Sequence, residues 1–173
     1  MFKRITTLSL LAILIVPAAT FGQTRKRSSR RPAAKPAAAT VSAARTTGAT
    51  RVADQIKNMT KFIYLLGGVT SGIAAVDEAA RRNEASPQLL QQNQQNKVTV
   101  KNSIQNFRVA LDNLETDFRA TPELQPYYIK LAGSAAGAAT AEEQAAANQF
   151  DAAGRTLLGV INRLTDVLVI MRQ

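Results

Sequence analysis

After Val52, apolar side chains recur along the chain at alternating spacings of four and three residues. Three series have this spacing: Val52, Ile56, Met59, Ile63, Leu66, Thr70 and Ile73; Val100, Ile104, Phe107, Leu111, Leu114 and Phe118; and Phe150, Ala153, Leu157, Val160, Leu164, Val167 and Met171. A shorter series with smaller side chains contains Tyr128, Leu131, Ala135 and Ala138. This heptad spacing places each series on one face of a helix, as in coiled coils and left-handed bundles. The chain is therefore predicted to be all-α.

Proline and cap residues divide the series into four helices. Ser86-Pro87 and Thr121-Pro122 have the pattern of an N-cap followed by proline in the first turn. Pro126 would disrupt a helix that is already running, so the third helix is expected to begin there. Asn148 is suited to a left-handed cap. The predicted helices are 52–83, 87–119, 126–147 and 150–172, and their short connections favour an up-down-up-down four-helix bundle.

The N-terminal residues have the composition of an export signal. Lys3 and Arg4 precede the short apolar run Leu8–Val16, and small residues follow it. We expect residues 1–22 to be a signal peptide that is cleaved between Gly22 and Gln23, which places the protein in the periplasm or outside the cell. An uncleaved anchor is the alternative, although the run is shorter than the roughly 20 residues of a membrane span.

Residues 23–51 form a segment of Arg, Lys, Pro, Ala, Ser and Thr that contains eight bases and no acid. It has too little apolar surface to offset its ordering entropy, so we expect a disordered linker before a bundle at 52–173. A second interpretation is a tether to an anionic envelope component. The candidate tether residues are Arg25, Lys26, Arg27, Arg30 and Arg31. Residues 52–173 carry twelve bases and twelve acids, so no specific nucleic-acid binding is expected.

The sequence contains neither Cys nor His. Disulfides, zinc fingers, iron–sulfur clusters and His-ligated haem are therefore excluded. The i,i+4 acid–base pairs, such as Asp151 with Arg155, have the favourable orientation for exposed helix faces. We expect no catalytic residue, metal ligand or cofactor site.

The segment Phe62–Val76 has no charged residue and three glycines. Fifteen residues are too few for a membrane span, and the order of glycines fits no dinucleotide or phosphate loop. Each glycine inside a helix costs about 1 kcal/mol relative to alanine, which indicates a packing reason. We expect Gly68 and Gly72 to form the closest contact with the last helix, at the height of Gly154. The wall of a ligand cavity is the alternative.

The two N-terminal helices are predicted to be longer than the other two, so their hairpin should overhang the bundle. Its apolar stripes end at Asp77 on one helix and at Lys97 and Asn93 on the other. We expect Asp77 and Lys97 to pair, which would contribute at most about 1 kcal/mol. Together with Arg81 and Arg82, these residues are predicted to form a solvated tip for partner contact.

These features favour an exported, non-catalytic bundle that acts through protein or envelope interactions, without a transmembrane helix once the signal is removed. A small-molecule binding or sensory bundle is the alternative, and it requires a ligand-sized cavity with convergent polar groups. In a third interpretation the bundle is a spacer and the basic linker is the active part.

Overall fold

The computed structural model describes residues 37–173, and within this range the regular structure consists of helices without a strand. The all-α prediction is confirmed for this part of the chain. The predicted signal peptide and residues 23–36 of the predicted linker lie outside the described residues. The helices are α1 (Ala37–Arg81), α2 (Pro87–Ala120), α3 (Gln125–Leu131), α4 (Ser134–Ala146) and α5 (Phe150–Arg172).

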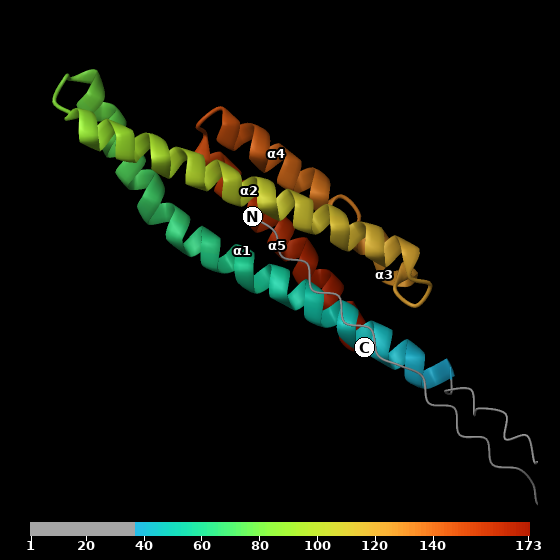
Figure 1. Ribbon diagram of the computed structural model, residues 1–173. Coiled ribbons are helices and arrows are strands. Elements are labelled where there is room, and N and C mark those ends of the chain that lie inside the picture. Colours follow the sequence, from blue (N-terminus) through green and yellow to red (C-terminus); the bar gives the residue numbers. More distant parts are fainter. Residues whose placement is uncertain (1–36) are drawn as a thin grey trace, which may run out of the picture. The chain divides into compact units, whose positions relative to one another are not determined.

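The helices pack as a bundle in which α1 contacts α2 and α5, and α4 contacts the same two helices from the other side (Figure 1). The short α3 packs on α5 and α2. Each heptad series supplies the core. On α5 all seven predicted positions are buried, and on α2 five of six are. On α1 every second position of its series is buried, namely Val52, Met59, Leu66 and Ile73.

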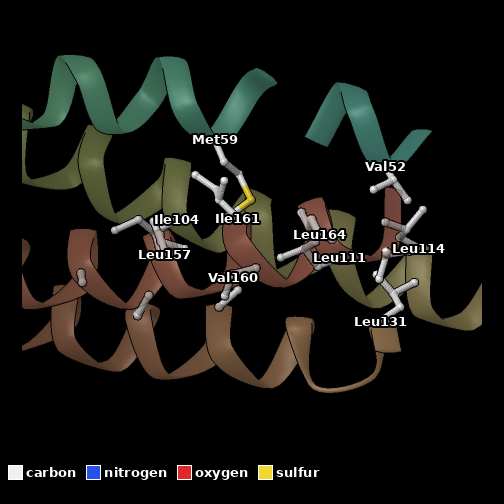
Figure 2. Close-up of a cluster of buried hydrophobic side chains, with 14 of the residues drawn as sticks. Val52, Met59, Ile104, Leu111, Leu114, Leu131, Leu157, Val160, Ile161 and Leu164 are labelled. Carbon is white, nitrogen blue, oxygen red and sulfur yellow. The ribbon is translucent and has the colours of Figure 1, made fainter. Parts of the chain in front are cut away.

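The centre of the core lies between α1, α2 and α5. Figure 2 shows Val52 and Met59 pointing from α1 toward α5, where Leu157 and Leu164 lie in the same buried cluster. These side chains are 0% exposed. Full burial of a large aliphatic side chain stabilises a fold by roughly 1.5–3 kcal/mol, so this cluster is the main source of stability in a chain without disulfides.

The first helix begins at Ala37, so the prediction of a disordered linker is wrong for residues 37–51. This segment is rich in alanine, the strongest helix former. Arg45 Nε donates a hydrogen bond to the carbonyl oxygen of Met171 at 2.5 Å. Gly48 is buried, and a Cβ atom built on it would lie 3.1 Å from Met171 Cε. The segment packs through small residues and one arginine, which a search for large apolar side chains does not detect.

The third predicted helix, 126–147, is interrupted and forms α3 and α4. Gly133 at the break has φ 90°, a left-handed conformation that favours glycine. Arg163 of α5 donates a hydrogen bond from Nη1 to the carbonyl oxygen of Ala132 at 2.7 Å. The break therefore results from a glycine and from a partner on another helix that satisfies the freed carbonyl.

The other helix ends follow the predictions closely. The Ser86 side chain accepts a hydrogen bond from the backbone N–H of Leu89 at 3.3 Å, and Asn148 has φ 60° between α4 and α5. The third helix starts at Gln125, one residue before Pro126. Thr121 is an exception. It ends α2, with its N–H donating to the Asp117 carbonyl oxygen, and does not begin the next helix.

Candidate functional site on the first helical hairpin

The hairpin of α1 and α2 extends past the connection between α4 and α5, as Figure 1 shows at the upper left of the bundle. This arrangement agrees with the predicted overhang. We call residues 78–92, beyond Asp77 and Asn93, the hairpin tip. The α1–α2 turn within it contains Asn83, whose φ of 57° places it in the left-handed region and reverses the chain.

A polar cluster of Asp77, Asn93 and Lys97 lies at the base of the hairpin tip. Asp77 Oδ1 accepts hydrogen bonds from Lys97 Nζ at 2.7 Å and from Asn93 Nδ2 at 2.8 Å. The predicted pairing of Asp77 with Lys97 is therefore confirmed. Because one carboxylate oxygen binds a group from each of two consecutive turns of α2, the cluster fixes the register of the hairpin.

The cluster is more buried than the predicted solvated tip. Asn93 is 4% exposed and the Lys97 side chain is 17% exposed. Within the described chain, Asn93 Oδ1 has no hydrogen-bond partner. Asn93 occupies a position of the α2 heptad series, one heptad before Val100, and it faces α1 for that reason. The prediction that Asn93 and Lys97 are solvated is wrong, and they form the anchor of the tip rather than its surface.

Arg81 and Arg82 lie on the exposed side of the tip, as predicted. Arg81 Nη2 is 2.9 Å from Glu78 Oε2, and Arg82 Nε lies 3.8 Å from the other oxygen of Glu78 and 3.5 Å from Glu84. All four side chains are more than half exposed. Exposed pairs of this kind contribute about 0–1 kcal/mol each, so these charges remain free to exchange partners.

Leu89 and Leu90 complete the surface of the tip, and the sequence analysis did not single them out. Each is 41% exposed in the first turns of α2. Leu89 lies outside the heptad series that contains Val100, and Leu90 lies on its extension, two heptads before Ile104. Two adjacent leucines on a segment already expected to overhang the bundle were the signal that could have identified them.

Gly68 and Gly72 do not contact α5. A Cβ atom built on either residue meets no other atom within 4 Å, so the predicted close approach is wrong. Gly154 is the close contact instead, because its Cβ position lies 3.2 Å from Leu66 Cδ2. Leu66 is on the core stripe. Gly68 follows it by two residues, or about 200° around the helix, and therefore faces outward.

The outward side of α1 is apolar and largely uncovered. Tyr64 is 84% exposed, Leu65 is 54% exposed, and Val69 is also exposed. The whole segment between Lys61 and Asp77 lacks a charge. A bundle surface of this kind normally carries charged residues, and contiguous exposed apolar patches mark interaction sites.

Two shallow grooves border this side of α1. A groove of about 230 Å³ lies toward α2, and polar side chains of α2 line one wall of it, namely Asn96, Thr99 and Ser103. A groove of about 260 Å³ lies toward α5, beside Gly154 and the half-exposed Leu158. Both volumes fall below the roughly 300–1,000 Å³ typical of ligand pockets.

Among the described helices, α1 alone is long and apolar enough to cross a membrane by length and composition. One 18-residue window within Val41–Arg81 has at most two charged residues, and 22% of it is buried. The fifteen uncharged residues alone are too short to span a membrane, but α1 as a whole is long enough. Core helices that are mostly buried meet the same criterion. The buried part of α1 includes Leu66 and Ile73, and most of its apolar window faces outward.

The remaining candidate residues carry no further chemistry. Within residues 37–173, no group of three or more acidic side chains is placed to hold a metal ion. The five candidate tether residues, Arg25, Lys26, Arg27, Arg30 and Arg31, lie outside the described residues. Comparison of the chain with protein-family models, curated proteins and solved structures found no match.

Proposed function

We propose that this protein is an exported, non-catalytic helical bundle that binds a protein or an anionic envelope component through its hairpin tip. In this proposal the chain folds as an up-down-up-down bundle whose third segment consists of α3 and α4. Residues 1–22 direct export and are removed. In this proposal α1 stays packed on α2 and α5, because its departure would expose to water the core side chains that it covers on α5, such as Leu157 and Leu164.

The observation that carries the proposal is the exposure of Leu89 and Leu90 on a hairpin whose base is fixed. The cluster around Asp77 holds α1 and α2 in register immediately below these residues. Exposed leucines on the same tip as the exposed Arg81 and Arg82 provide an apolar contact surface together with charges, as in transient protein interfaces. A preordered tip also loses less conformational entropy on binding than a flexible loop would.

A pair of substitutions on α2 tests the proposal. Leu90→Asp places a charge on the tip, and Val109→Asp places the same charge at a position that is 47% exposed, about 28 Å farther along the helix. Both variants should keep the far-UV circular dichroism of the parent. After chemical cross-linking in intact cells and fractionation of the envelope, Leu90→Asp should lose the cross-linked adduct and Val109→Asp should keep it.

Two results would contradict the proposal. Equal adducts from Leu90→Asp and from the parent would show that the tip does not bind the partner. Equal loss from both variants would show that added negative charge, rather than its position, weakens the contact.

A small-molecule binding bundle is the second candidate. The groove toward α2 has an apolar floor with Phe62 and Leu66 and a wall of uncharged polar side chains that includes Thr99 and Ser103. Ser103→Leu would fill this groove. If a small apolar compound raises the melting temperature of the parent and not that of Ser103→Leu, this candidate gains support over the hairpin tip.

A further inference from the structure

The uncovered side of α1 presents a defined set of residues to solvent. We call Tyr64, Leu65, Gly68, Gly72 and Ala75 the outward face. At 100° per residue these positions lie within about 100° of one another and opposite the core stripe of α1. All five are exposed, and no other atom of the described chain lies within 4 Å of a Cβ built at either glycine.

We infer that a second copy of this chain covers the outward face, with the two α1 helices antiparallel across a twofold axis near residue 69. The face is independent of the hairpin tip, so this inference goes beyond the proposed function. Symmetric pairs with the same surface on both subunits are the commonest oligomers. The argument for a second copy concerns the order of side-chain sizes and charges along the face. This order is complementary to the same face of a copy that runs in the opposite direction.

The sizes of the side chains match in this arrangement. The large residues Tyr64 and Leu65 lie before position 69, and the small residues Gly72 and Ala75 lie after it. An antiparallel pair centred there sets Leu65 of each copy against Gly72 of the other, and Tyr64 against Ala75. The flanks also match. Leu65 and Gly72 lie on the side of the face toward α2, and Tyr64 and Ala75 lie on the side toward α5. A twofold axis perpendicular to the helices places the α2 side of one copy against the α2 side of the other, and likewise for the α5 side.

One pair of charges at the ends of the face matches as well. Asp54, Lys57 and Lys61 precede the uncharged segment, and Glu78, Arg81 and Arg82 follow Asp77. The same axis places Lys61 of one copy near Glu78 of the other, and the ion pair of Asp54 with Lys57 near Arg82. A parallel pair would instead place each charged residue beside the same residue of its partner, which is unfavourable. Charge complementarity of this kind selects orientation more than it adds affinity.

The contact is of modest size. Residues 61–78 cover about 27 Å of helix, and helices with small residues at the contact approach to about 8 Å. Interfaces at the small end of the range belong to weak and reversible complexes. We therefore expect a dimer that dissociates on dilution, and sedimentation velocity over a concentration series of the exported protein will detect it.

A glycine pair provides the matched variants. Gly72→Glu introduces a carboxylate at the centre of the contact in both copies. Gly159→Glu introduces the same group on the exposed side of α5, where a Cβ also meets no atom within 4 Å. Neither substitution crowds the fold, and each replaces glycine by a better helix former. Gly72→Glu should weaken dimerisation at least about tenfold, because the carboxylate would be buried against Leu65 of the other copy, and Gly159→Glu should not change it.

Single cysteines test the orientation, because the chain has none of its own. Gly68→Cys lies beside the proposed axis and should form a disulfide-linked dimer under mild oxidation. Lys61→Cys lies 16 residues from its symmetry mate along the contact, about 24 Å, and should not. Efficient cross-linking of both variants would indicate a parallel pair and overturn the inference.

Sedimentation as a monomer at all concentrations would also overturn it. So would flotation of the monomer with vesicles of anionic phospholipid that Gly72→Glu abolishes, because the face would then serve a lipid surface. None of these results bears on Leu90 or the hairpin tip, so failure of this inference is distinguishable from failure of the proposed function.

Discussion

Leu65 and Leu66 are adjacent and chemically identical, and the fold assigns them opposite roles. Leu66 is 4% exposed, and its Cδ2 packs against Gly154 of α5. Leu65 is 54% exposed on the outward face. Truncation of a buried leucine to alanine removes its transfer free energy and leaves a cavity, at a cost of about 2–5 kcal/mol. Truncation of the exposed neighbour should change the free energy of unfolding by about 0.5 kcal/mol or less.

The assay is urea unfolding followed by far-UV circular dichroism, at a protein concentration low enough that self-association does not contribute. Leu66→Ala should lower the unfolding midpoint, and in thermal scans it should lower the melting temperature by roughly 3 °C for each kcal/mol in a domain of this size. Leu65→Ala should leave both unchanged. Equal losses from the two variants, or a larger loss from Leu65→Ala, would show that the assigned core stripe of α1 is wrong.

Three further outcomes are expected. Asp77→Ala should lower the free energy of unfolding in urea by about 1–3 kcal/mol, because it leaves the largely buried Lys97 without its carboxylate partner. An unchanged free energy of unfolding would mean that the cluster does not fix the hairpin. Gly133→Ala should lower the free energy of unfolding by about 1–3 kcal/mol, because Gly133 has a left-handed backbone conformation. Gly159→Ala should raise it by up to about 1 kcal/mol, because alanine is the better helix former. A more stable Gly133→Ala variant would contradict the break between α3 and α4. Mass spectrometry of the exported protein should find Gln23 at its N-terminus, and an intact signal segment would favour a membrane anchor.

The heptad series predicted most of the core correctly because burial in a bundle follows helical periodicity directly. Every predicted core position of α5, from Phe150 to Met171, is buried. The same periodicity and the punctuation at Ser86-Pro87 and Asn148 located most helix ends. Helix length then predicted the overhang, because it depends only on the rise per residue.

The errors occurred where small or polar residues decide the packing. Residues 37–51 contain almost no large apolar side chain, and yet Gly48 and Arg45 bring that part of α1 against α5. Asn93 was expected in solvent because it is polar, although the heptad phase of Val100 and Ile104 already placed it on the buried side.

The glycines of α1 were assigned to the wrong neighbour for a related reason. Three glycines inside a helix indicate that something approaches closely, and α5 was the expected partner within the chain. The register set by Leu66 turns Gly68 away from the bundle, where no side chain of the described residues approaches it. Sequence periodicity defines which side is buried, and it does not define what meets the other side.

Site-specific photo-cross-linking tests the central claim, partner binding at the hairpin tip, most directly. A photoreactive residue at Leu90 and one at Val109 probe two sites of similar exposure on the same helix. We predict a discrete adduct in intact cells from position 90, weakened by Arg82→Glu, and none of the same mass from position 109. Adducts of equal yield at both positions, or none at position 90, would contradict the account.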